Sequence, residues 1–224
     1  MNLIQLLMEG QHSLTDASGR IYGVVIGIVT ENKDTDSQDQ QDSDKRGKVK
    51  VRFPWLSEKE GGTWARVATL MAGNDRGIFY LPEVEDEVLV AFEHGDVRYP
   101  YVLGALWNGK DKPPATNADG KNNKRLIKSR SGMTILLDDT SGSEKIEIAD
   151  KDSQNKIMID MTNKKISIIS NGDIELNASQ GNLSLTANAI KFNSTGETEI
   201  KATGTLNIQG QTVNVKGQPT INLN

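Results

Sequence analysis

Acidic side chains are the groups in this sequence whose types and spacing come closest to a chemical site. Residues 30–46 contain six acids, of which five are closely spaced aspartates: Asp34, Asp36, Asp39, Asp42 and Asp44. Carboxylate oxygens at such spacing can bind calcium, but an EF-hand loop also needs a central glycine and a glutamate at its twelfth position. The segment has neither of these. It also lacks apolar side chains that could be buried, so we interpret it as a mobile loop rather than a metal site.

Two further acidic stretches could be drawn as functional groups. In EHGD (93–96), His94 lies between carboxylates and could act as an acid or base, but no serine or cysteine stands beside it as a nucleophile. A glycine between polar residues is typical of a hairpin turn. PEVEDE (82–87) holds four acids at the entry to a strand, which favours a solvated turn over a surface for a basic partner. We therefore predict no catalytic residue, no metal site and no cofactor, and the absence of cysteine excludes disulfides and zinc–thiolate sites.

The elements that carry these residues are short strands. Six runs of apolar and β-branched residues are separated by glycine-rich turns, and no convincing helix lies among them. The runs are 20–29, 47–53, 63–70, 77–82, 86–93 and 98–107. This pattern predicts a small all-β barrel.

Aromatic residues divide the chain into two regions. Ten of the eleven precede residue 108, and only Phe192 follows it. The change falls in residues 107–125, where two prolines, two glycines and four asparagines are typical of a linker. We therefore expect an N-terminal arm (1–18), a barrel domain (19–108), a linker (109–123) and a repeat region (124–224).

Apolar and polar residues alternate from residue 124 onward, which predicts strands. The alternating segments are 124–130, 132–139, 145–150, 156–161, 165–170, 173–179, 182–188, 189–195, 198–204, 206–211, 212–218 and 220–224. From Ile166 to Ile221, one anchoring apolar residue per segment recurs at intervals of 8, 9, 7, 10, 6, 7 and 8 residues. A period near eight, with Gly, Asn or Ser at the corners, is typical of a β-helix or β-prism.

The energetics of one such repeat point to more than one chain. Two or three apolar side chains contribute roughly 1.5–3 kcal/mol each when fully buried. Ordering eight residues of backbone costs roughly 8–16 kcal/mol. Neighbouring strands must therefore supply hydrogen bonds and cover the apolar faces, and an eight-residue strand is about one side of a triangle. We predict a homotrimer in which three chains wind around one axis.

The sequence resembles the central spike proteins of contractile phage tails and related injection systems, namely baseplate assembly protein V and the spike part of VgrG proteins. Within residues 47–114 the motifs that carry the resemblance are VRFPW (51–55), WARVA (64–68), G-x-x-x-x-P-E-x-x-D-E-V-L-V-x-F (77–92), G-D-x-R-x-P (95–100) and V-x-G-x-L-W (102–107). Each motif alone is weak, but together they match the family's OB-fold pattern. The eight-residue repeat and the ending PTINLN match the family's trimeric β-helix, so the likeness covers nearly the whole chain after residue 18.

The resemblance implies a mechanical role. Three OB folds would form a collar at the end of a rigid inner tube, and a C-terminal intertwined trimeric β-helix would be driven through a target envelope when the sheath contracts. It implies separate hub proteins, because the chain is short for the extra domains of long VgrG proteins, and no inserted lysozyme-like domain. The hub or the first inner-tube ring would bind the collar, where LIQLLMEG (3–10) could dock as an arm or pack locally. Contact with the target membrane would be by mechanical penetration alone.

The C-terminus departs from one branch of this family. Some short phage spikes end in a His-x-His pair that binds iron, whereas the nearest histidine here is His94. The ending looks more like the blunt spikes that receive a separate conical tip, a PAAR-repeat protein. We therefore expect the tip protein to dock on Gly217, Gln218, Pro219, Thr220, Ile221, Asn222, Leu223 and Asn224.

Other functions fit the sequence less well. A net charge of −4 gives no general attraction to nucleic acid, although an OB-fold nucleic-acid binder stays an alternative. A β-helical tail fibre or a polysaccharide-binding or -cleaving trimer would need paired carboxylates and aromatic platforms, and the repeat region supplies only Phe192. A spike that carries an effector domain is a third alternative. We expect synthesis in the bacterial cytoplasm without a signal peptide, and incorporation into a virion tail or a contractile particle.

Overall fold

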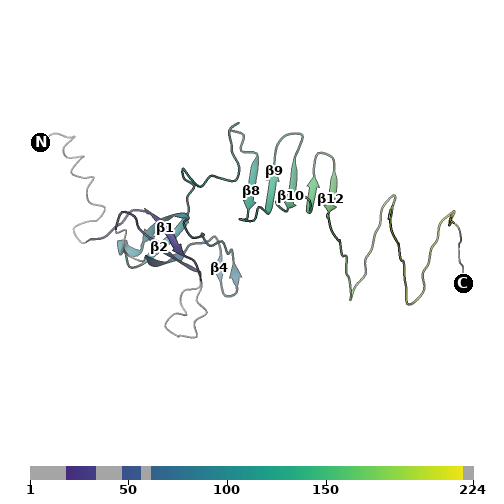
Figure 1. The fold of residues 1–224 in the computed structure, drawn as a ribbon, viewed down its shortest axis with the longest axis horizontal. Helices are drawn as coiled ribbons and strands as arrows, with labels where there is room; N and C mark the ends of the chain where they lie inside the picture. Colours follow the sequence, from purple (N-terminus) through teal and green to yellow (C-terminus); the bar gives the residue numbers. More distant parts are fainter. Residues whose placement is uncertain (1–18, 34–46, 57–61, 219–224) are drawn as a thin grey trace. The chain divides into compact units, whose positions relative to one another are not determined.

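The computed structural model describes residues 19–33, 47–56 and 62–218 (Figure 1). The first group of elements is β1 (Val25–Glu31), β2 (Lys48–Arg52), β3 (Thr63–Val67), β4 (Ala72–Gly73), β5 (Arg76–Gly77), β6 (Glu87–Phe92), the single-turn 3-10 helix η1 (Glu93–Gly95) and β7 (Pro100–Ala105). The second is β8 (Lys124–Lys128), β9 (Thr134–Asp138), β10 (Lys145–Ala149), β11 (Lys156–Asp160) and β12 (Lys165–Ile169). The chain divides into two compact units, Met1–Asn171 and Gly172–Asn224.

Five strands close into a barrel in the order β1-β2-β3-β7-β6. Four of the pairings are antiparallel, and the β3–β7 pairing is parallel. The small all-β barrel predicted from residues 20–107 is therefore confirmed. Because the sheet closes on itself, none of these five strands is left as an open edge.

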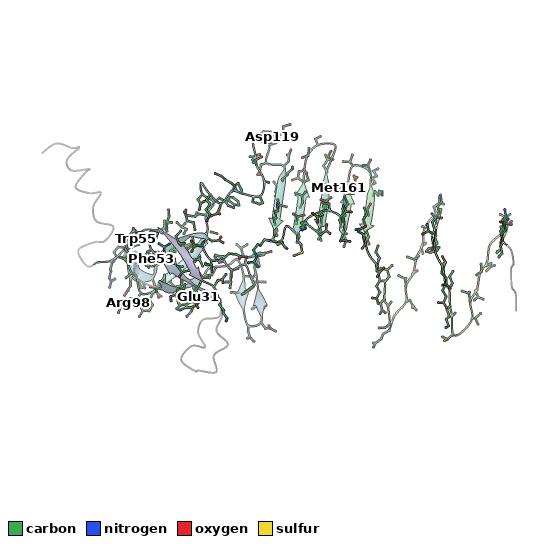
Figure 2. The ribbon with its side chains drawn as sticks, viewed as in Figure 1. Glu31, Phe53, Trp55, Arg98, Asp119 and Met161 are labelled. Carbon is green, nitrogen blue, oxygen red and sulfur yellow. The ribbon has the colours of Figure 1, made fainter. Side chains whose placement is uncertain are left out.

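The barrel core follows from alternation along the strands. In β2 and β6, valines at every second position face inward and are fully buried. The residues between them are only partly buried, and they are charged in β2 and apolar in β6. Phe53 packs against Phe92 with ring centroids 5.4 Å apart and against Trp55 at 5.8 Å (Figure 2). The buried side chains are Ile21, Val25, Val29, Val49, Val51, Phe53, Ala65, Val88, Val90, Phe92 and Val102.

The strand predicted over 77–82 is wrong in its extent. Only Gly77 belongs to a strand, in the two-residue hairpin of β4 and β5, where Ala72 pairs with Gly77 and Gly73 with Arg76. The following residues, Ile78, Phe79 and Tyr80, are exposed and lie outside any sheet. An apolar run alone does not make a strand, because a strand also needs a partner for its hydrogen bonds.

Asparagine side chains order the segment between β7 and β8. The Asn108 side-chain oxygen accepts hydrogen bonds from the backbone N–H groups of Lys110 and Asp111 at 2.8 and 2.7 Å. The Asn117 side-chain oxygen accepts one from the Asn122 N–H at 2.6 Å. These asparagines therefore form local turns, as their side-chain amides commonly do.

Strands β8 to β12 form one antiparallel sheet, in which each strand pairs with the next along the chain (Figure 1). The strands predicted from alternation between 124 and 170 are present, but they are joined as consecutive hairpins. Met161 follows the last residue of β11 at one of these turns (Figure 2). The repeat region therefore begins as an antiparallel meander.

Residues 172–218 contain no strand within this single chain (Figure 1). Every residue in this range is exposed. The sequence predicted seven alternating segments here and at 219–224, and the last of them lies outside the described residues. A strand forms only where a second strand completes its hydrogen bonds, so the intertwined β-helix stays a prediction about several copies.

Candidate assembly surfaces

The meander presents one face made almost entirely of aliphatic side chains. A row of five isoleucines crosses all five strands, one from each, in direct register. A second row on the same face contains four aliphatic residues and Arg125. We call these nine residues the aliphatic face: Ile127, Ile135, Leu137, Ile146, Ile148, Ile157, Ile159, Ile166 and Ile168.

The aliphatic face is uncovered in the single chain. Its nine side chains are between 38% and 70% exposed. Covering what is exposed is worth about 1 kcal/mol per side chain, or roughly 9 kcal/mol for the face. A contiguous apolar surface of this size marks a place where another surface binds.

The opposite face of the meander carries charge. One row across the five strands alternates in sign: Lys124, Asp138, Lys145, Asp160 and Lys165. Hydrogen bonds from Thr140 are the main cause that lowers the pKa of Asp138, and Lys124 and Lys145 lower it further. The half-buried residues of this face, among them Leu136 and Met158, are partly covered within the chain. The two faces therefore differ in kind, and the aliphatic one is suited to burial.

Carboxylates close the turns of the meander. Asp150 accepts hydrogen bonds from the Gln154 and Asn155 backbone N–H groups at 2.9 and 3.2 Å, and Asp160 accepts one from the Asn163 N–H at 2.8 Å. Hydrogen bonds, first from the Asn155 and Asn163 side chains, lower the pKa of these two carboxyls. The acids of this region thus hold hairpins in shape.

Residues 172–218 repeat a pair of exposed apolar side chains two positions apart. Examples are Ile174 with Leu176 and Val213 with Val215. Two residues separated by one lie on the same side of an extended chain, so each pair forms one apolar spot. These spots have no cover from the described part of the chain.

The predicted tip-docking residues are only partly described. Gly217 and Gln218 are exposed and follow the last of these apolar pairs. Pro219, Thr220, Ile221, Asn222, Leu223 and Asn224 lie outside the described residues. So do the aspartates Asp34, Asp36, Asp39, Asp42 and Asp44 and the arm 3–10.

His94 lies in a turn, and the acidic residues on either side of it accept hydrogen bonds from nearby side chains. Glu93 accepts a hydrogen bond from the Tyr101 hydroxyl at 2.7 Å, and this contact is the main cause that raises the pKa of Tyr101. Asp96 accepts hydrogen bonds from the Arg98 side chain, with Nη2 at 2.6 Å from Oδ2, which lowers the pKa of Asp96 to about 2. His94 itself sits at φ 49° in the turn. These contacts shape the hairpin between β6 and β7.

Acids of the 82–87 segment also form a turn. The Glu83 N–H donates to the Asp86 carboxylate at 2.8 Å, and the Asp86 N–H donates to the Glu83 carbonyl at 3.1 Å. Glu83 also forms an ion pair with Arg130.

In the parts of the chain that the structure describes, no three His, Cys, Asp or Glu side chains come together in a way that could hold a metal ion. Nor do those parts contain a helix with the length and hydrophobicity of a membrane span.

Sequence reasoning missed how the aliphatic face is assembled. Alternation identified the strands, but the register that brings one isoleucine from every strand into a single row was not predicted. The turn residues carried a usable signal, because an acid followed two to five residues later by Thr, Gln or Asn recurs after Asp138, Asp150 and Asp160. That pattern favours hairpins over a wound chain.

The barrel matches a known domain family. Residues 25–107 match the family described as the type VI secretion system/phage-baseplate injector OB domain. The match covers β1 to β7, so the part of the chain that resembles the injector OB domain is the closed five-stranded barrel.

The curated relatives include spike proteins of type VI secretion systems. The chain is 33% identical over 112 residues to spike protein VgrG3 of Vibrio cholerae, a match that covers 46% of this chain and 11% of VgrG3. It is 28% identical over 127 residues to spike protein VgrG1a of Pseudomonas aeruginosa, covering 52% of this chain and 20% of that protein. It is 29% identical over 119 residues to the actin cross-linking toxin VgrG1 of Vibrio cholerae, covering 49% of this chain and 11% of the toxin. The chain therefore spans a fifth or less of the length of these relatives, and the matches support its place among contractile injection spike proteins.

Proposed function

We propose that this chain is the central spike of a contractile tail or injection system, in which three copies form a collar of OB domains followed by a needle. The observation that carries the proposal is the sequence of elements: an injector OB barrel, then a sheet whose nine-residue aliphatic face is exposed, then regularly spaced exposed apolar pairs. A single copy leaves all of this apolar surface in water. Three copies that turn their aliphatic faces toward one axis would bury it.

The needle acts mechanically in this proposal. When the sheath contracts, the inner tube pushes the spike through the target envelope. Stiffness comes from paired strand edges and a narrow apolar interior, and it does not need a catalytic residue. Two of the relatives described above are named as spike proteins, and the third is named as an actin cross-linking toxin.

The native mass tests the trimer. Sedimentation at micromolar concentration is expected to give three times the 24.5 kDa of one chain. Resistance to SDS without heating is expected as well, because wound chains separate slowly. A well-folded species at 24.5 kDa would contradict the proposal.

A loss-of-function experiment tests the piercing role. Particles assembled without this chain should be unable to penetrate target cells, and the wild-type gene supplied in trans should restore penetration. Normal penetration by particles that lack the chain would contradict the role.

Two binding partners complete the proposal. Residues 217–224 form the docking surface for a PAAR-type tip protein, and the collar binds the hub or the first inner-tube ring. Deleting 219–224 should abolish co-purification of the tip protein while the trimer mass stays unchanged. If the tip protein still co-purified, its binding site would lie outside residues 219–224.

A further inference from the structure

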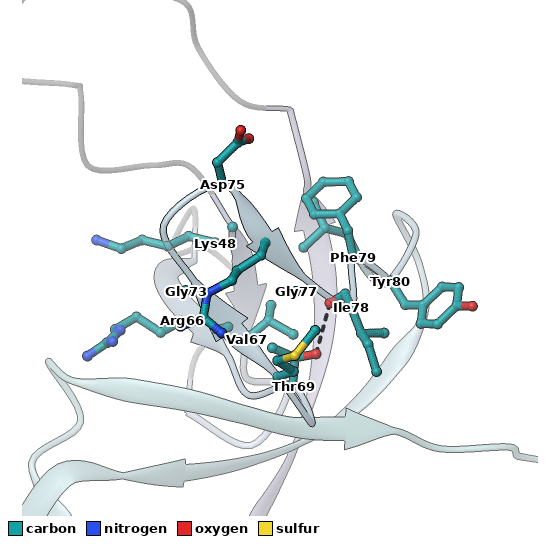
Figure 3. A pocket seen from close by; sticks show the side chains of 15 residues that line it. Lys48, Arg66, Val67, Thr69, Gly73, Asp75, Gly77, Ile78, Phe79 and Tyr80 are labelled. Carbon is teal, nitrogen blue, oxygen red and sulfur yellow. Dashed lines mark hydrogen bonds between the residues drawn. The ribbon is translucent and has the colours of Figure 1, made fainter.

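The OB barrel carries a pocket that the described residues of its own chain leave open. The hairpin β4–β5 and its flanks border a space of about 850 Å³ beside the barrel (Figure 3). Lys48 at the start of β2 and Arg66 in β3 contribute to one wall, and segment 69–81 contributes most of the others. The pocket lies in the first unit of the chain.

Among the described residues that line this pocket, cations outnumber acids. Lys48, Arg66 and Arg76 line it together with one acid, Asp75. Lys48 and Arg66 extend to the same side of the hairpin (Figure 3). The Arg66 guanidinium lies 5.6 Å from the centre of the Tyr101 ring, which fixes its direction.

Arg76 has a place made for it by a neighbouring glycine. A Cβ at Gly73 would come within 2.8 Å of Arg76 Nε, so the arginine side chain lies in space that a larger residue 73 would share. No ion pair to Arg76 is found in the described ranges of the chain. The pocket is thus prepared for a negatively charged group.

Apolar side chains line the same pocket, and hydrogen bonds hold the backbone that carries them. Met71 is 47% exposed and Ile78 is 37% exposed. The Ile78 N–H donates to the Met71 carbonyl at 3.0 Å, and the Thr69 hydroxyl donates to the Ile78 carbonyl at 2.9 Å (Figure 3). An occupant of this pocket would therefore have both an acidic and an apolar group.

The turn at 82–87 of the same barrel offers such a pair of side chains, one acidic and one apolar. Val84 is 48% exposed, and Glu85 beside it is held by a hydrogen bond from its N–H to the Val29 carbonyl at 2.8 Å. Glu83 is already paired with Arg130, whereas no ion pair to Glu85 is found among the described residues. Val84 and Glu85 therefore form a fixed projection with one apolar and one negative side chain.

We propose that Val84 and Glu85 of one copy enter the pocket of the next copy in the collar, with Glu85 against the cations and Val84 against Met71. A projection and a pocket at different places on one surface make a head-to-tail contact, which closes into a ring in a cyclic trimer. The inference rests on the proposed trimer because it needs a neighbouring copy. It adds to that proposal a specific contact between the OB barrels.

Cysteine cross-linking tests the contact cleanly, because the chain has no cysteine of its own. Full-length chains with Met71→Cys and with Val84→Cys, carrying different tags, are co-expressed and oxidised. A disulfide that joins the two tags is expected in mixed trimers, and neither variant alone should cross-link. The matched control replaces Val84→Cys with Tyr99→Cys, an exposed site beyond the far end of β6, and should give no product.

Charge variants then test the polar half of the contact. Arg76→Glu in the Met71→Cys chain should slow cross-linking roughly tenfold, and Glu85→Arg in the partner chain should restore it. Lys110→Glu makes the same charge change at an exposed residue outside the pocket and should have no effect. A mass of three copies without the Met71–Val84 disulfide would overturn this contact but leave the trimer standing, whereas a monomeric mass would overturn both.

Discussion

At the scale of single residues, the barrel core leaves no room at Gly27. A Cβ at this position would lie 2.3 Å from Val51 Cγ1 and 3.3 Å from the Phe53 ring. Val51 is fully buried, so it cannot move away without disturbing the core. We expect Gly27→Ala to destabilise the barrel by about 2 kcal/mol, measured from the urea midpoint of tryptophan fluorescence.

Gly104 supplies the control for that change. It also lies in a barrel strand, but a Cβ there meets nothing within 4 Å. Gly104→Ala should leave the midpoint unchanged or raise it slightly, because alanine restricts the unfolded chain. If both substitutions shifted the urea midpoint equally, the short distance between a Cβ at residue 27 and Val51 would not be the cause of the destabilisation.

The ion pair between Asp96 and Arg98 gives a second prediction for single residues. Hydrogen bonds from Arg98 are the main cause that lowers the pKa of Asp96 from 3.8 to about 2. Because the folded pKa is below the unfolded one, the pair stabilises the fold fully above pH 3.8 and loses its effect as the pH falls through about 2. Arg98→Gln should raise the pKa of Asp96 toward 3.8, as read from carboxyl carbon shifts in an NMR titration.

The same titration contains its own reference. Asp150 owes its lowered pKa first to Asn155 and should titrate identically in the wild type and in Arg98→Gln. If Asp96 kept its low pKa without Arg98, backbone groups rather than the guanidinium would be its main partners.

At the scale of elements, the aliphatic face of the meander should decide assembly. Ile148 lies in the central strand of the five and within the isoleucine row. Ile148→Asp should cost about 3 kcal/mol per copy in the trimer, because a carboxylate would be buried against apolar neighbours. In a single chain the same site is half exposed, so the barrel should stay folded while sedimentation shows loss of the trimer.

Lys128 provides the comparison on the other side of the sheet. It is exposed on the opposite face of β8, and Lys128→Asp changes the charge without touching the aliphatic face. This variant should remain a trimer. Dissociation by Lys128→Asp, or a stable trimer with Ile148→Asp, would show that the aliphatic face is not the buried one.

The limits of sequence reasoning are clearest at this scale. Alternation located β2, β6 and the meander strands, since valines or isoleucines recur at every second position. The apolar run at 77–82 was misread because pairing depends on a distant partner, and Ile78 to Tyr80 have none in a sheet. The pocket that we propose as a docking site could not be predicted either, because Lys48 and Arg66 meet only through the register of β2 and β3, and Arg76 reaches them only through the β4–β5 hairpin.

At the scale of the whole molecule, assembly should order a segment that one chain cannot order. In residues 172–218 a single copy forms no strand, and the backbone hydrogen bond from the Gly181 N–H to the Ala178 carbonyl only closes a local turn. Amides without partners exchange with solvent quickly, whereas strand amides are protected. If three copies wind together, hydrogen exchange measured by mass spectrometry should show slow exchange in 172–218 of the wild type.

The dissociated variant makes this a test of coupling between the parts of the molecule. In Ile148→Asp the amides of 172–218 should exchange at nearly the rates of a free chain, since the strand partners that the trimer supplies would be lost. Barrel amides such as that of Val29, which donates to the Asp86 carbonyl at 3.0 Å, should stay protected, because the barrel closes within one chain. Fast exchange in 172–218 of a wild-type sample whose mass is that of three copies would mean that this segment is not wound, and that the meander alone holds the trimer.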